Sequence, residues 1–193
     1  MTDTPAQEFR KIGGRFGDLA AAVRPEQWDD PAPVEGWAAR DVVRHLVEWF
    51  PEFLAGGADV HLSAGPSVDD EPAGAWHHLQ REVQALLDDP AMAERVLSNR
   101  HIGDVALPQA VSRFFTADVF MHTWDLARAT GQDDTLDPLR CADMLAGMEP
   151  IEELMRQSGQ YGPRVEVAED ADEQSRLLGF IGRDPLWRPP NPT

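Results

Sequence analysis

The residues of this chain best suited to chemistry stand where the core of a helix is normally apolar. Asp118, His122 and Asp125 follow one another at spacings of four and three residues, and apolar residues continue this spacing on both sides. The full stripe is Val111, Phe115, Asp118, His122, Asp125 and Ala129. One face of an α-helix therefore carries two carboxylates and an imidazole toward the interior. Burying these charges is costly unless a partner compensates them, and a divalent metal ion would compensate all three.

A second histidine has the same inward register in an earlier segment. His45 falls within a helical apolar stripe formed by Val42, Leu46, Trp49 and Phe53. Two imidazoles and one carboxylate leave coordination positions open on zinc or another divalent ion, as in catalytic metal sites. We therefore predict His45, Asp118 and His122 as metal ligands, with water or a thiol in the open positions.

Each of these residues also has an interpretation that needs no metal. His45 is compatible with a core histidine bonded to a backbone carbonyl, and the Asp-x-x-x-His pair with a buried ion pair. Asp125 either accepts a hydrogen bond that orients a ligating imidazole or pairs with Arg128 or an arginine of another helix. Trp49, one turn after His45, either walls the site or packs in the core. Trp124 lies off the stripe and is predicted to pack against the third helix.

Apolar periodicity and helix breakers predict the elements that position these side chains. Helices are expected over 9–23, 42–53, 76–89, 108–130, 138–148 and 171–181. Pro51 is expected to kink or end the second helix. The segment 56–74 is expected as a loop, and 91–107 as a connection with a helical turn near 92–96 and an extended piece near 102–106.

This pattern favours an all-α fold. We expect an up-and-down four-helix bundle with short peripheral helices and a Pro-rich C-terminal tail. The length of 193 residues suits one domain, residues 1–193. Metal sites in bundles form between facing helices, which is the arrangement predicted for the two histidine segments. Homodimers are common among such bundles, although no feature of the sequence demands one.

The composition of the chain indicates which classes of binding partner and which cellular location to expect. With 17 basic and 34 acidic residues, the net charge of −17 argues against nucleic acid and anionic membranes, because phosphate contacts need clustered Lys and Arg. No window approaches the roughly 18 apolar residues of a transmembrane helix. Cys141 is the single cysteine. It cannot form an internal disulfide and is expected as a buried hydrophobe, so a cytoplasmic location is expected.

Two motifs carry a resemblance to a known family. They are Gly-Trp-Ala-Ala-Arg-Asp-Val-Val-Arg-His-Leu at 36–46 and His-Thr-Trp-Asp-Leu-Ala-Arg-Ala-Thr-Gly-Gln at 122–132. Both resemble the metal-binding domain of mycothiol-dependent maleylpyruvate isomerases, within the DinB-like superfamily of four-helix bundles. The closing stretch, with Gly-Pro at 162–163, Arg-Leu-Leu at 176–178 and Gly-Arg-Asp-Pro at 182–185, resembles a single-domain subgroup. The resemblance therefore covers nearly the whole chain.

The resemblance implies a metal site and a type of reaction. In the isomerases, the histidine of a His-Leu element and a Glu-x-x-x-His pair hold the metal. These positions correspond to His45, Asp118 and His122 in this sequence. The aspartate side chain is one methylene shorter than the glutamate of the family. In the family, the residue that precedes the histidine-bearing helix is often Ser or Thr, whereas this sequence has Ala38 there. Zinc is implied, with nickel or another divalent ion as alternatives.

At such a site a small thiol such as mycothiol binds as thiolate and reacts with a small-molecule electrophile. The isomerases carry an additional C-terminal domain that this length does not provide. The resemblance therefore implies a thiol-dependent transferase or isomerase without maleylpyruvate as the substrate. A noncatalytic metal- or ligand-binding module and a metal-dependent hydrolase are the alternatives.

Overall fold

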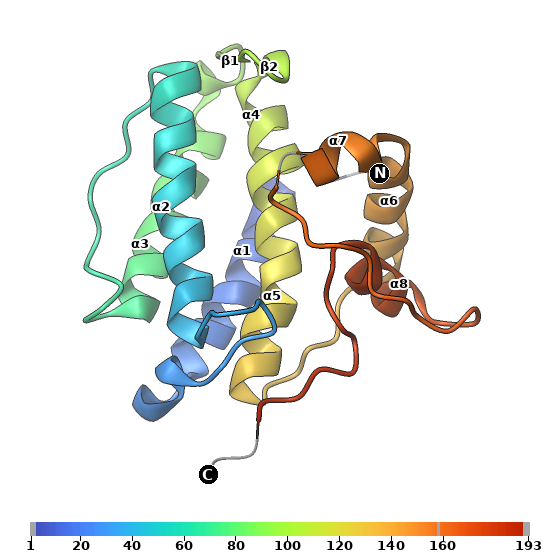
Figure 1. Cartoon of the computed structure of the whole chain (residues 1–193). Helices are drawn as coiled ribbons and strands as arrows, with labels where there is room; N and C mark the ends of the chain where they lie inside the picture. The colour runs from blue at the N-terminus through green and yellow to red at the C-terminus, as the bar shows by residue number, and fades with distance from the viewer. Residues whose placement is uncertain (1–2, 158, 191–193) are drawn as a thin grey trace.

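Four long helical segments pack side by side and carry the main core of the protein (Figure 1). The computed structural model describes residues 3–157 and 159–190. The segments are α1 Pro5–Ala22, α2 Ala39–Ala58, α3 Pro72–Asp88, and the continuous run of α4 Leu107–Ala110, η3 Val111–Thr116 and α5 Ala117–Thr130. Both α1 and α2 pack against α3 and α5, so α1 and α2 lie diagonally opposite each other. The predicted all-α four-helix bundle is confirmed.

The second and third helices of the bundle run in the same direction. Arg44, near the start of α2, pairs with Asp69 just before α3, with Nη2 2.7 Å from Oδ1. Arg10, near the start of α1, pairs with Asp88 at the end of α3 at 2.7 Å. The segment 59–71 therefore returns the chain along the bundle, as Figure 1 shows. The up-and-down alternation of helix direction predicted from the sequence is therefore wrong for α2 and α3. The connection between them is long enough to cross from one end of the bundle to the other.

Helix α2 does not end at Pro51. Proline removes one backbone hydrogen bond of the helix, yet α2 continues to Ala58. Phe50 and Leu54, on either side of the proline, are fully buried. Packing of this face offsets the lost hydrogen bond, and the predicted loop 56–74 is accordingly shortened to 59–71.

The connection between the third and fourth helices contains a β-hairpin, and one of its strands confirms the extended piece predicted near 102–106. The helical turn predicted near 92–96 is wrong, because the short 3-10 helix ends at Met92 and a strand begins at Val96. After the short η2 Pro90–Met92, strand β1 Val96–Asn99 pairs antiparallel with β2 Gly103–Ala106. Leu97 is fully buried against α2. It lies so close to Gly57 that an added Cβ would be 2.8 Å from the leucine Cγ. The hairpin thus closes one end of the bundle (Figure 1).

The N-terminus of α2 lacks a side-chain cap. Ala38 has the extended backbone of an N-cap residue, with φ −100° and ψ 170°, but offers no acceptor. Ala38→Ser is expected to stabilise the protein by about 1 kcal/mol, because its hydroxyl can accept a backbone N–H of the first turn. Urea denaturation measures the gain. Ala38→Val is the control and should give none; equal midpoints for the serine variant and the native protein would contradict the prediction.

Helix α5 is the most completely covered element. Every residue from 119 to 127 is buried, because the bundle lies on one face and the C-terminal part of the chain on another. The polar residues His122, Thr123 and Asp125 are therefore buried together with the apolar ones. No helix in the described ranges is long and apolar enough to cross a membrane.

The C-terminal part forms a second apolar cluster around α5. The helices of this C-terminal part are α6 Pro138–Met148, η4 Glu149–Ile151, α7 Glu152–Gln157 and α8 Glu173–Phe180. Three side chains of α5, Phe120, Met121 and Trp124, belong to this cluster. The prediction that Trp124 packs against the third helix is therefore wrong, since the side of α5 that carries it faces the C-terminal helices. That residues 1–193 form one domain stays a prediction.

Cys141 is fully buried in the second cluster. Burial, reinforced by the charge of Asp137, raises the pKa of its thiol to about 12. The thiolate form that a nucleophile needs is therefore suppressed at neutral pH. The expectation of a buried hydrophobe is confirmed.

Gly179 in α8 allows the segment 163–167 to lie against the helix. Val165 N–H donates to the Gly179 carbonyl at 2.9 Å, and a Cβ on Gly179 would lie 2.6 Å from the Val165 oxygen. Gly179→Ala is expected to destabilise the protein by about 1–3 kcal/mol through overpacking. Thermal unfolding measures this loss.

The matched control is Gly147→Ala in α6, where no atom lies within 4 Å of the added Cβ. This variant should be neutral or stabilising by up to about 1 kcal/mol, because alanine favours the helix over glycine. Equal effects of the two substitutions would contradict the close approach at Gly179.

Candidate metal centre

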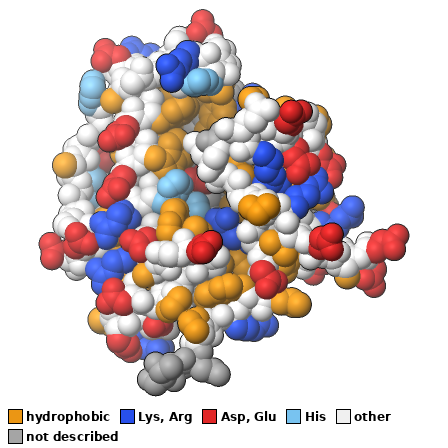
Figure 2. Space-filling view, viewed as in Figure 1, with side chains coloured by type: hydrophobic (Ala, Val, Ile, Leu, Met, Phe, Trp, Pro, Cys, Tyr) orange, Lys and Arg blue, Asp and Glu red, His pale blue; other side chains and the backbone are white. Residues whose placement is uncertain are grey.

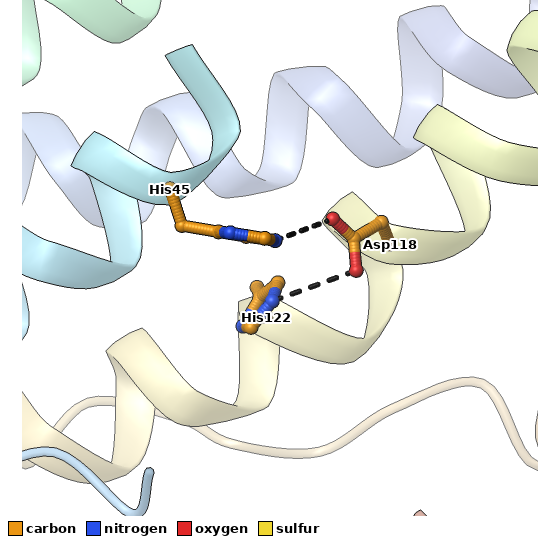
Figure 3. A group of neighbouring side chains, drawn as sticks. All are labelled: His45, Asp118 and His122. Atoms are coloured by element: carbon orange, nitrogen blue, oxygen red, sulfur yellow. Dashed lines mark hydrogen bonds and ion pairs between the residues drawn. The ribbon is translucent and has the colours of Figure 1, made fainter. Parts of the chain in front are cut away.

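Side chains from α2 and α5 meet inside the bundle (Figure 3). His45 Nε2 lies 3.0 Å from Asp118 Oδ2, and His122 Nε2 lies 3.5 Å from Asp118 Oδ1. One ligand atom from each residue lies within 4.8 Å of the others. The structure thus brings together the three residues predicted as ligands. Across the described part of the chain, no other group of three His, Cys, Asp or Glu side chains meets this spacing.

The π-helical turn η3 directly precedes Asp118 and was not predicted from the sequence. Such turns occur often at functional sites, because they change the direction of the side chains that follow. Phe115, within η3, stacks on Phe50 of α2 with ring centroids 3.8 Å apart. This contact holds together the two helices that carry the candidate ligands, close to the site.

The site is closed at His122 and open at His45. The exposed fraction of the side chain rises from 7% for His122 through 18% for Asp118 to 34% for His45. Figure 2 shows histidine and hydrophobic side chains in a hollow between the bundle and the C-terminal part. A small molecule can therefore approach past His45.

Asp118 is held as a carboxylate. Trp49 Nε1 donates to Asp118 Oδ2 at 3.0 Å, so the predicted wall residue contacts a candidate ligand directly. Burial opposes ionisation, but the combined influence of His122, His45 and Trp49 outweighs it and lowers the pKa of Asp118. The ionised form is the one that binds a metal.

Asp125 orients His122, and Arg183 orients Asp125. His122 Nδ1 donates to Asp125 Oδ2 at 2.8 Å. Arg183 donates to both oxygens of Asp125, with Nε 3.0 Å from Oδ1 and Nη2 3.0 Å from Oδ2. Burial alone would raise the pKa of Asp125. The charge and hydrogen bonds of Arg183 and His122 lower it by more than burial raises it, so the net shift is downward.

The structure therefore shows both interactions considered for Asp125, the hydrogen bond to an imidazole and an ion pair. The arginine is Arg183, which follows α8, and not Arg128. Arg128 Nε pairs instead with Asp134 Oδ2 at 2.8 Å. The sequence could not select between them because residues 125 and 183 are distant along the chain.

The hydrogen bond to Asp125 selects the tautomer of His122. An ionised carboxylate only accepts hydrogen bonds, so a neutral His122 carries its proton on Nδ1. Its Nε2 then directs a lone pair toward Asp118 Oδ1, which is also an acceptor. Two facing acceptors favour a cation between them. The donor set of two imidazoles and a carboxylate therefore fits a divalent metal ion.

Two aromatic residues at the site were not predicted. The ring centroid of Trp37 lies 5.3 Å from that of His45 and 5.7 Å from that of His122, on which it stacks. Burial and the charge of Asp118 raise the pKa of Tyr161 to about 12, so its hydroxyl stays protonated. Trp37 lies in the motif at 36–46, which was a usable signal. Tyr161 is the single tyrosine of the chain, and no pattern marked it.

Comparison with known proteins places these residues in a family. The family described as "Mycothiol maleylpyruvate isomerase N-terminal domain" matches residues 9–127. The chain belongs to this family. The match confirms the predicted resemblance and includes all three candidate ligands as well as Asp125. Arg183 and Tyr161 lie beyond it.

Two curated proteins of Mycobacterium tuberculosis are similar to this chain. They are "Uncharacterized protein MT0763" of strain CDC 1551 / Oshkosh and "Uncharacterized protein Rv0738" of strain ATCC 25618 / H37Rv. Each is 27% identical over 163 residues, which covers 76% of this chain and 79% of the relative. No solved structure matches the chain.

Proposed function

We propose that the protein binds a divalent metal ion through His45, Asp118 and His122 and acts as a thiol-dependent transferase or isomerase. The observation that supports this proposal is the convergence of two imidazole nitrogens and one carboxylate within 4.8 Å. Three protein ligands leave positions for exogenous ligands. Zinc suits this donor set best, and nickel or another divalent ion is also compatible.

A bound divalent ion would supply charge that keeps a small thiol in its thiolate form at neutral pH. The chain itself places two tryptophans against the candidate ligands: Trp37 contacts both histidine rings, and Trp49 donates to Asp118. His45, on the open side, borders the path by which a thiol and a small-molecule electrophile enter. The family description points to mycothiol as the thiol. A cytoplasmic location, where thiols stay reduced, belongs to the same proposal.

Metal analysis and spectroscopy test the proposal. Purified protein is expected to contain one divalent ion per chain, and the cobalt-substituted protein is expected to develop a thiolate-to-cobalt charge-transfer band when mycothiol is added. The S-methyl derivative of the thiol, which cannot form a thiolate, is the control and should produce no band. Protein that binds neither zinc nor cobalt would overturn the metal site, and an unchanged spectrum would overturn the role of the thiol.

The structure bears on the two alternatives. Metal-assisted hydrolysis needs a general base beside the bound water. Asp125 was the candidate from the sequence, but it is 1% exposed and occupied by Arg183 and His122. Measurement of turnover distinguishes an enzyme from a noncatalytic binding module. Protein that binds stoichiometric metal but transfers no thiol to any of a panel of electrophiles would favour the binding module.

A further inference from the structure

Arg183 makes a two-point polar contact beside the candidate metal centre. Its guanidinium reaches both oxygens of Asp125, with Nε 3.0 Å from Oδ1 and Nη2 3.0 Å from Oδ2. Such a fork contact fixes the plane of the carboxylate as well as its position. The same carboxylate accepts from His122 Nδ1 at 2.8 Å. Arg183 is therefore linked through one residue to a candidate ligand.

The backbone before Arg183 is held tightly in place. Gly182 has a positive φ of 86°, and a Cβ there would lie 3.0 Å from the Pro163 oxygen. Arg183 N–H donates to the Leu178 carbonyl at 2.8 Å. Residue 182 thus turns the chain sharply out of α8 and against the segment 162–163. The Gly-Pro and Gly-Arg-Asp-Pro sequences noted above meet at this point.

The backbone after Arg183 is also anchored to the ligand-bearing helix. Arg128 of α5 donates from Nη2 to the Pro185 carbonyl at 3.0 Å. Arg183 is itself only 15% exposed in its side chain. The arginine therefore stands at a fixed point between the C-terminal helices and α5, and its guanidinium has little freedom to leave Asp125.

We propose that Arg183 is a positioning residue of the metal centre: it fixes Asp125 so that His122 keeps its proton on Nδ1 and presents Nε2 to the metal. The segment after residue 127, outside the family match, thereby completes the site. Without the fork, the Asp125 carboxylate is free to rotate, and His122 gains access to the tautomer that donates from Nε2 to Asp118. In that tautomer the lone pair is on Nδ1, on the side of Asp125, and Nε2 has none to offer a metal between His122 and Asp118.

The first measurement needs no metal. Nitrogen-15 spectra of histidine-labelled, chelator-treated protein, recorded at a pH where the imidazole is neutral, report the tautomer of His122. Native protein should show the proton on Nδ1, whereas Arg183→Gln should show a mixture or the Nε2–H form. Arg183→Lys perturbs the fold less and should give an intermediate result, because an ammonium cannot form the fork. Arg176→Gln, on an exposed ion pair of α8, is the control and should resemble native protein.

The second measurement is zinc affinity, obtained by competition with a chromophoric chelator, and it rests on the proposed function. Loss of a residue that orients a ligating histidine typically lowers affinity about 10–100-fold, and Arg183→Gln is expected to fall in this range. An unchanged tautomer in both Arg183 variants would overturn the positioning role. A changed tautomer with unchanged affinity would overturn its importance for the metal. If native protein binds no zinc, the metal proposal fails, while the tautomer still decides the role of Arg183.

Discussion

His122→Ala is expected to abolish the stabilisation of this protein by zinc. Structural zinc sites with four ligands bind with about 10–16 kcal/mol, or about 2.5–4 kcal/mol per ligand. Removal of one imidazole should therefore weaken zinc binding roughly 10²–10³-fold. At zinc concentrations about 100 times the native Kd, native protein gains about 2.7 kcal/mol. For a chain of this size that gain raises Tm by about 5–10 °C, and the variant should show almost none of it.

Scanning calorimetry with and without zinc measures this difference. Asp118→Asn should also lose the zinc response, because the amide lacks the negative charge of the carboxylate that sits between the two imidazoles. His101→Ala is the matched control, since His101 is an exposed histidine between β1 and β2. It should keep the full zinc response. A zinc-induced rise in Tm that survives His122→Ala would place the metal elsewhere.

Asp125→Ala is expected to cause a large loss of stability. The substitution leaves Arg183 largely buried without its carboxylate, and it leaves His122 Nδ1 without an acceptor. Breaking a buried pair in this way typically costs about 3–5 kcal/mol. Denaturant unfolding of chelator-treated protein measures the loss independently of any metal.

Asp88→Ala provides the comparison. Asp88 pairs with Arg10 at 2.7 Å, as closely as a good ion pair allows, but the side chains are 47% and 55% exposed. The loss there should stay below about 1 kcal/mol, because solvent screens an exposed pair. Similar losses for Asp125→Ala and Asp88→Ala would mean that the buried ion pair contributes no more than a surface one.

The stabilising role of Asp125 should also depend on pH. Its pKa is lower in the folded protein than its ordinary value. The stability it contributes is therefore present above the ordinary Asp pKa of about 4 and is lost as the pH falls toward the folded value. The difference in stability between native protein and Asp125→Ala should narrow below about pH 4. A difference that grows in this acidic range would contradict this sign.

The predicted ligand stripe depended only on local geometry. Asp118, His122 and Asp125 share one face because the α-helix repeats every 3.6 residues, and this holds wherever the helix packs. His45 was predicted in the same way from the stripe of α2. The family motifs then linked the two helices. For this reason three candidate ligands on two separate helices were predicted without coordinates, and their binding of a metal stays a proposal.

Contacts between distant segments were beyond the reach of the sequence. Helical periodicity states which face of a helix is buried, but not which element covers it, so Trp124 was placed against the wrong neighbour. The parallel course of α2 and α3 depends on a long connection whose path no local signal describes. The π turn before Asp118 adjusts hydrogen bonding by one residue, below the resolution of an apolar pattern.

The amino-acid sequence by itself determined the four helices of the bundle, their buried faces and the three candidate ligands, because these follow from residue types at short spacings. The tertiary structure alone decided that Asp125 is held by Arg183, that Trp37 stacks on His122, and that the site opens at His45. Each of these depends on residues brought together across the bundle or from beyond it. Such contacts arise from the packing of the whole chain, in which many distant side chains compete for the same space.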